Sequence, residues 1–158
     1  MTDTRPWSQD QDHLLASLLD EIVPANADGR VTAAGALGVA EFLAGKASAD
    51  PELAASLRTV LSRAAALAEA SGARFDDLDA AGRIGIVKAL EREAPDAFTA
   101  LLWHTYMGYY SRADVRPQFG LSPRPTQPEG YELPEDDPDE LADMLAPVRG
   151  RGRRYRPA

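Results

Sequence analysis

The sequence contains no cysteine and only two histidines, His13 and His104, among its 158 residues. Without cysteine the chain cannot form disulfide bonds, zinc ribbons, iron–sulfur clusters, a catalytic thiolate or a covalent haem attachment. Two histidines are also too few for a histidine-based metal cage. We therefore expect no metal site and no cofactor-binding site in this chain.

The sequence also lacks an excess of basic residues and a long apolar run. It has 17 Lys and Arg against 25 Asp and Glu, a formal charge of −8, whereas nucleic-acid binding needs a basic face. No stretch reaches the roughly 18 apolar residues of a membrane span. The first ten residues contain no apolar signal core and no paired arginines. These absences predict a cytoplasmic protein that neither binds nucleic acid nor inserts into a membrane.

What the sequence does contain is a series of segments with the apolar spacing of helices that bury one face. Ser8 and Asp79 are good N-cap residues for two of them. In the fourth segment we expect Ile84, Val87 and Leu90 to face the core. Together the segments predict an all-α fold, a compact bundle of about five helices, over residues 8–23, 36–47, 51–70, 79–92 and 96–110.

The character of the chain changes after Ser111. Residues 112–133 contain four prolines, which exclude a continuous helix there. A short acidic helix is expected at 139–145. We predict a helical domain at 8–111 and a Pro-rich extended C-terminal arm at 112–158. The apolar residues of the arm either wrap a partner or pack back on the helices.

The sequence offers little that resembles a catalytic site. It contains no Gly-x-Ser-x-Gly elbow, no phosphate-binding glycine loop and no His-Glu-x-x-His motif. His104 lies near the end of the fifth helix without the partner residues that a general base requires. We expect a hydrogen bond or the helix dipole to hold it there. The alternative, an enzyme that uses His104 with a nearby tyrosine or acid, requires a deep pocket around this residue.

Aromatic residues are concentrated in the C-terminal part of the chain, where eight of the 11 lie in residues 98–158. Trp103, Tyr106 and Tyr110 fall on one stripe of the fifth helix. A second face, which includes Tyr109, is also apolar. A helix that is apolar on two sides is either central in its own bundle or shared with a partner. Tyrosine-rich surfaces suit protein interfaces, because each ring buries a large area and keeps a polar tip.

Charges are segregated near the end of the chain. Seven acidic residues between positions 132 and 143 precede five arginines between positions 149 and 156. We expect these arginines to pair with carboxylates of a partner, to which the guanidinium fork is well matched. The alternative function is a stand-alone helical regulatory or nucleic-acid-binding protein that uses this Arg-rich tail.

Short motifs along most of the chain resemble those of one family, the small subunit (subunit 3) of gluconate 2-dehydrogenase-type flavoprotein complexes. They include a leucine-rich helix that ends in Ile-Val-Pro, a Gly-Ala-x-x-Gly-Val segment, a Phe-x-x-Leu turn, an aromatic helix that ends in Gly-Tyr-Tyr, and a proline-rich piece that closes on Gly-Tyr. In this sequence they occupy residues 18–24, 35–43, 75–78, 98–111 and 119–131.

This resemblance implies a non-catalytic accessory subunit. Its partner would be a large FAD-dependent dehydrogenase of the glucose–methanol–choline (GMC) class that oxidises a sugar, sugar acid or glycoside. The FAD would belong to the partner and not to this chain, and in some members of the family a haem-bearing cytochrome subunit completes the complex. No catalytic residue carries over. Many members have a twin-arginine export signal, and none precedes Trp7, which favours the cytoplasm over the periplasm.

We expect the surface that meets the large subunit to combine aromatic residues of the fifth helix with residues of the arm and the Arg-rich tail. The predicted interface residues are Tyr106, Tyr109, Tyr110, Arg112, Phe119, Gly130, Tyr131, Arg149, Arg151 and Tyr155.

Overall fold

A computed structural model describes residues 6–124 and 137–150, and all the regular structure in these ranges is helical, as predicted. The chain divides into two compact units between Pro123 and Arg124, and each is described by itself.

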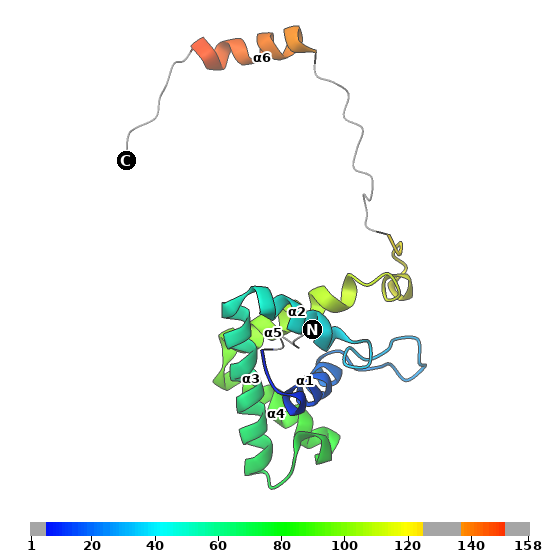
Figure 1. Cartoon of the computed structure of the whole chain (residues 1–158). Helices are drawn as coiled ribbons and strands as arrows, with labels where there is room; N and C mark the ends of the chain where they lie inside the picture. The colour runs from blue at the N-terminus through cyan, green and yellow to red at the C-terminus, as the bar shows by residue number, and fades with distance from the viewer. Residues whose placement is uncertain (1–5, 125–136, 151–158) are drawn as a thin grey trace, which may run out of the picture. The chain divides into compact units, whose positions relative to one another are not determined.

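The domain boundary predicted after residue 111 stays a prediction. The elements of the first unit, coloured from blue to yellow in Figure 1, are α1 (Gln9–Ile22), α2 (Val39–Ala49), α3 (Pro51–Ala70), the 3-10 turn η1 (Phe75–Asp77), α4 (Ala80–Glu93), α5 (Pro95–Tyr110) and the 3-10 turn η2 (Arg116–Phe119). The second unit contains α6 (Pro138–Gly150).

The helices of the first unit begin where side chains satisfy the unpaired backbone N–H groups of the first turn. The Ser8 hydroxyl accepts a hydrogen bond from the backbone N–H of Gln11, and the Gln11 side chain accepts one from the N–H of Ser8. The Asp79 carboxylate accepts a hydrogen bond of 2.7 Å from the backbone N–H of Gly82. Asp50 caps α3 in the same way. These caps explain why α1, α3 and α4 start at the predicted positions.

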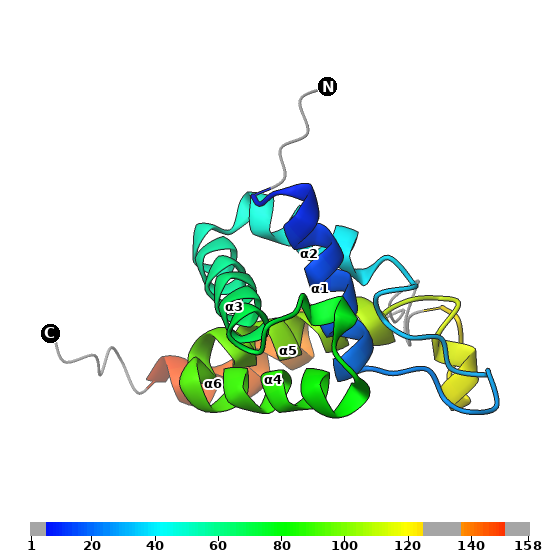
Figure 2. The same ribbon diagram turned by 90° about the horizontal axis from the view of Figure 1, so that it is seen from below.

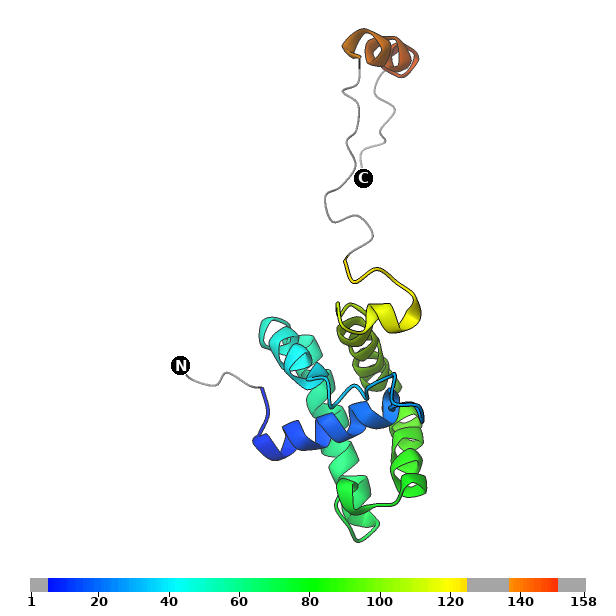
Figure 3. The same ribbon diagram turned by 90° about the vertical axis from the view of Figure 1, so that its right-hand side faces the viewer.

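α3 lies at the centre of the first unit and packs against α1, α2, α4 and α5. Leu57, Val60, Leu61 and Ala64 on α3 are fully buried. α1 crosses α3 in Figure 3, and the view from below in Figure 2 shows α1 and α4 near each other, in agreement with their contacts. An ion pair between Glu21 and Arg83 joins these two helices.

The structure corrects the predicted core face of α4. Ile84 is 44% exposed, whereas Ile86 and Leu90 are buried. Residues 86 and 90 are four positions apart and share one face of the helix, while residue 84 points to the opposite side. Because two isoleucines lie within three positions, their apolar character alone does not determine which one faces α3. Val87 is partly buried at the edge of the core.

α2 begins three residues later than predicted, because the segment before it is held in turns by α1. The Asp20 carboxylate accepts hydrogen bonds from the backbone N–H groups of Gly35 (2.7 Å) and Ala36 (3.3 Å). Gly38 then has a φ of 72°, a left-handed conformation that ends these turns before the helix starts. A side chain at Gly35 would collide with the backbone oxygen of Ala16, so this segment can lie against α1 only with glycine there.

The start of the predicted arm packs back on the helices, one of the two alternatives that the sequence left open. Val115 is fully buried in the core. The backbone turns after α5, with hydrogen bonds from Val115 N and Arg116 N to the carbonyl oxygen of Arg112. This turn brings η2 back to the end of α5. Residues 125–136 of the arm lie outside the described residues.

α6 is longer than the predicted 139–145 and continues through Pro147 to Gly150. Among residues 6–124 and 137–150, no helix combines the length and the apolar content that a bilayer crossing requires.

Candidate functional site

α5 has one face that packs into the bundle. Leu101, Thr105, Gly108 and Tyr109 are buried on this face. The Thr105 hydroxyl donates a hydrogen bond of 2.7 Å to the carbonyl oxygen of Leu101, so the polar group is satisfied within the helix. A side chain at Gly108 would meet the ring of Phe42 at 2.6 Å, and glycine here allows α2 and α5 to pack closely.

The opposite face of α5 is also apolar, but it is exposed. Trp103, Tyr106, Met107 and Tyr110 occupy positions i, i+3, i+4 and i+7, which form one stripe along a helix. Trp103 has 66% of its surface exposed, and the other three are each at least 40% exposed. The described residues thus include a helix whose outward stripe has the composition of a protein interior.

η2 extends this stripe beyond the end of α5. The Phe119 ring lies against Tyr110 with a centroid distance of 5.3 Å in an edge arrangement. Tyr110 also contacts Tyr106, with centroids 5.9 Å apart. Phe119 is itself 46% exposed. We call the five residues Trp103, Tyr106, Met107, Tyr110 and Phe119 the aromatic surface.

Tyr109 supports the aromatic surface from inside. Its ring is fully buried and contacts Tyr110 edge-on at a centroid distance of 5.1 Å. Its hydroxyl donates a hydrogen bond of 2.7 Å to the carbonyl oxygen of Thr32, in the loop between α1 and α2. Burial raises the pKa of the Tyr109 phenol, because the charged phenolate is poorly solvated there. The end of α5 is therefore fixed to a segment 77 residues away in the sequence.

An ion pair lies in the chain between Tyr110 and Phe119 of the aromatic surface. Arg112 binds the Asp114 carboxylate with both ends of its guanidinium, at 2.9 and 2.8 Å. These hydrogen bonds lower the pKa of Asp114 and raise that of Arg112. Arg116 donates a hydrogen bond of 2.7 Å to the carbonyl oxygen of Ser122. These contacts hold the chain around η2 in a defined conformation.

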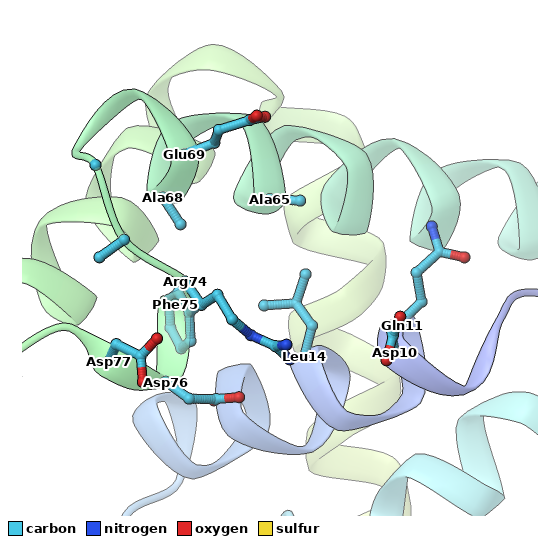
Figure 4. Close-up of a pocket in the computed structure, with 12 residues that line it drawn as sticks. Asp10, Gln11, Leu14, Ala65, Ala68, Glu69, Arg74, Phe75, Asp76 and Asp77 are labelled. Atoms are coloured by element: carbon cyan, nitrogen blue, oxygen red, sulfur yellow. The ribbon is translucent and has the colours of Figure 1, made fainter.

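A separate open hollow of 740 Å³ lies between α1, the end of α3 and η1 (Figure 4). Apolar side chains that include Leu14 and Phe75 line it, and Arg74 extends across it toward α1 in Figure 4. Its acidic lining residues are Asp10, Glu69, Asp76 and Asp77. Carboxylates and a guanidinium share this hollow with apolar side chains, without histidine or a hydroxyl nucleophile, so the lining does not define a ligand chemistry.

A smaller hollow of 180 Å³ is lined by Ser17, Asp20, Glu21, Asp76 and Arg83. Two of its carboxylates have structural roles, because Asp20 holds the segment before α2 and Glu21 pairs with Arg83. Among the residues that the structure describes, no three His, Asp or Glu side chains are grouped as a metal site requires.

The family description "Gluconate 2-dehydrogenase subunit 3" matches residues 9–115. The chain belongs to the gluconate 2-dehydrogenase subunit 3 family. No curated protein and no solved structure matches the chain. The family name identifies its members as subunits of a dehydrogenase complex. The matched region runs from the start of α1 to Val115, and therefore contains the whole of α5.

In this member of the subunit 3 family, the structure brings together three of the predicted interface residues, Tyr106, Tyr110 and Phe119. Arg112 lies beside them in sequence and is paired with Asp114. Tyr109 is buried in this structure, where its ring supports the surface from inside, and its place in the interface stays a prediction. Arg149 lies on α6, in the other compact unit. The remaining predicted residues, Gly130, Tyr131, Arg151 and Tyr155, lie outside the described residues.

The predicted set omitted Trp103 and Met107, which the structure places on the aromatic surface. Their helical spacing from Tyr106 and Tyr110 was a signal that could have identified both. The small residues Thr105 and Gly108 indicate that their face of α5 is the tightly packed one. Trp103 lies on the other face, so this pattern predicts that it is exposed.

His104 has the structural environment expected from the sequence. Its Nδ1 lies 2.9 Å from the carbonyl oxygen of Ala100, one turn earlier in α5. The ring is partly buried, and neither of the two hollows described above includes it in its lining. The deep pocket that an enzyme centred on His104 requires is therefore not formed by those hollows.

Proposed function

We propose that this chain is a non-catalytic accessory subunit that binds and stabilises a large FAD-dependent dehydrogenase of the GMC class. In this proposal the partner oxidises a sugar, sugar acid or glycoside and holds the FAD, and this chain supplies no catalytic group. A cytochrome subunit that removes the electrons is compatible with the same arrangement. Membership of the subunit 3 family over residues 9–115 supports an assembly with a larger dehydrogenase.

The aromatic surface is the observation that carries the proposal. A contiguous exposed apolar patch on a folded domain marks a site of interaction, and tryptophan and tyrosine dominate the energetics of protein interfaces. Trp103 is the most exposed aromatic residue of the described part of the chain. The rings of Tyr106 and Tyr110 can bury their flat faces while their hydroxyls remain at a polar rim.

The rigidity of the aromatic surface also favours binding. Tyr110 is in contact with Tyr106, Tyr109 and Phe119. Tyr109 is fixed by its hydrogen bond to Thr32. Side chains that are already ordered lose little conformational entropy when a partner covers them, so more of the interaction free energy appears as affinity.

Binding of this kind explains how a subunit without a catalytic group can stabilise an enzyme. A protein that binds only the folded form of its partner raises the free energy of unfolding of that partner, by about 2.7 kcal/mol when it is present at 100 times its Kd. The same linkage stabilises the accessory subunit. We therefore expect each protein to be less stable alone than in the complex.

The proposal is tested by purifying the tagged full-length chain from its native host and recording the absorption spectrum of the eluate. We expect a co-purifying protein of dehydrogenase size with flavin absorption bands. The Trp103→Ser variant should retain much less of it. The control is Ile84→Ser, because Ile84 is an exposed apolar residue on α4, outside the aromatic surface.

Recovery of the wild-type chain alone and colourless would contradict the proposal. Equal recovery of the flavoprotein with Trp103→Ser and Ile84→Ser would show that the interface lies elsewhere. Circular dichroism spectra of both variants provide the control for folding.

A further inference from the structure

α6 carries a stripe of apolar side chains that its own compact unit does not cover. Leu141, Met144, Leu145 and Val148 occupy positions i, i+3, i+4 and i+7, so they lie on one face of the helix. Met144 is 70% exposed and Val148 60% exposed, and no residue of α6 is buried. Helices that bind in a groove of another protein present anchors at this spacing.

The opposite face of α6 is acidic. Asp139 and Asp143 are four residues apart and lie away from the apolar stripe, and Glu140 lies at its flank. The Asp137 carboxylate accepts a hydrogen bond of 2.9 Å from the backbone N–H of Asp139 and so caps the helix. The only basic residue of α6 is Arg149, in its last turn.

A helix of this length is not expected to be stable without a covering surface. α6 has 13 residues, and isolated helices shorter than about 12–15 residues are marginal in water. Pro147 lies inside the helix and lacks the N–H that would bond to the preceding turn. Burial of the apolar stripe would supply the missing stabilisation, as it does for most helices in proteins.

The charge of α6 selects among the surfaces that could cover the stripe. An anionic membrane surface would repel the carboxylates at positions 137, 139, 140 and 143, because amphipathic helices that bind such membranes have Lys and Arg on the polar face. A second copy of α6 would bring equal acidic charges together. An apolar groove bordered by Lys or Arg matches both the stripe and the charge.

We propose that α6 is a docking helix that inserts the face formed by Leu141, Met144 and Val148 into an apolar, basic-rimmed groove on the dehydrogenase subunit. This inference rests on the proposed function for the identity of the partner. It concerns a second contact, since α6 lies outside the residues 9–115 matched by the family and outside the aromatic surface. Two linked contacts increase the affinity of a complex well beyond that of either contact alone.

The first test compares two full-length variants that carry the same new charge on opposite sides of α6. Met144→Asp places a carboxylate in the apolar stripe, whereas Ala146→Asp places one on the polar side, one turn from Asp143. The Kd of each variant is measured by biolayer interferometry against the flavoprotein recovered with the wild-type chain. We expect Met144→Asp to weaken binding at least about tenfold, a change of about 1.4 kcal/mol, and Ala146→Asp to change it by less than about threefold. Met144→Leu should bind like the wild type.

The second test identifies the surface that covers the stripe. A photo-crosslinking amino acid is placed at Met144, or at Ala146 as the control, and the products are mapped by mass spectrometry. Crosslinks from position 144 should reach a segment of the dehydrogenase subunit with Lys or Arg beside apolar residues. Crosslinks to a second copy of this chain would overturn the inference. The inference would also be overturned if the wild-type chain co-sedimented with lipid vesicles and Met144→Asp abolished that co-sedimentation.

The outcomes separate the two proposals. If the wild-type chain recovers the flavoprotein and Met144→Asp binds it equally well, the inference that α6 is a docking helix is wrong, and the proposed accessory function is unaffected. If the wild-type chain recovers no flavoprotein, the proposed function is wrong and the docking helix falls with it.

Discussion

One face of α5 carries Leu101, Thr105 and Tyr109, and the opposite face carries Trp103, Tyr106 and Tyr110. The first face is buried against the other helices and the second is exposed. Both combine large apolar side chains with hydroxyl groups. Hydrophobicity therefore does not distinguish them, and the α5 sequence reads as apolar on two sides.

The two faces differ in how their polar atoms are satisfied. On the inner face, Thr105 and Tyr109 donate to the carbonyl oxygens of Leu101 and Thr32. Among the described residues, no buried side-chain nitrogen or oxygen lacks a hydrogen-bond partner. On the outer face the tyrosine rings contact one another and leave area for a partner. The inner face thus stabilises this chain, and the outer face carries the surface that we propose binds the partner.

The largest effect on stability is expected on the inner face. Leu101 is fully buried, and replacing a buried leucine with alanine costs about 2–5 kcal/mol, because contacts are lost and a cavity remains. We expect Leu101→Ala to lower the free energy of unfolding by this amount in a urea titration followed by circular dichroism. A loss below about 1 kcal/mol would mean that this face contributes less to the core than its burial implies.

Replacement of the buried tyrosine has an intermediate effect. Tyr109→Phe removes the hydroxyl that binds the Thr32 carbonyl, and we expect a loss of about 1 kcal/mol. The effect should also depend on pH. The pKa of Tyr109 is raised in the folded state, so its contribution to stability is complete below the unfolded pKa of about 10 and declines as the pH rises above it.

The measurement is the difference in Tm between the wild type and Tyr109→Phe at several pH values. The wild type should lose more stability than the variant when the pH rises from about 9 to about 11. Parallel pH profiles would indicate that the buried phenol does not resist ionisation. If Tyr109→Phe kept the full stability of the wild type at neutral pH, the hydrogen bond between Tyr109 and the Thr32 carbonyl would contribute little to stability.

The smallest effect on stability is expected on the outer face. Trp103→Ala should change the free energy of unfolding by less than about 0.5 kcal/mol, the usual range for exposed positions, when it is measured beside Leu101→Ala. This result would sharpen the contrast between the faces, because loss of the same ring is expected to weaken partner binding. A large loss of stability would instead place Trp103 in the fold of the chain itself.

Local signals in the sequence were sufficient for much of the fold. α3 starts and ends at the predicted residues, with Asp50 as its cap, Pro51 in its first turn, and Gly72 in a left-handed conformation just beyond its end. These features depend on neighbours within one turn of helix, so they can be read without knowledge of distant residues.

Features that depend on distant residues were not predictable. The start of α2 was placed too early because Asp20, 15 residues before Gly35, holds that segment in turns. The buried face of α4 was predicted wrongly at Ile84, because Ile84 and Ile86 are equally apolar and only one of them can face the core. The burial of Tyr109 was not predicted, because nothing near it in the sequence indicates its hydrogen bond to Thr32.

The candidate site was predicted in part for the same reasons. The concentration of aromatic residues identified α5 and the turn that follows it, and the motifs identified the family. The exposure of Trp103 and the contact between Tyr110 and Phe119 required the structure.

The sequence by itself determined the helical class, most helix starts and the family, because periodic spacing, end caps and motif order are properties of contiguous residues. Only the tertiary structure decided which apolar face of α5 is buried. Burial of either face would be favourable. The choice depends on which face lets α2 approach closely, as Gly108 does beside Phe42, and which face can satisfy its hydroxyls. The other face remains exposed, and it carries the surface that we propose binds the partner.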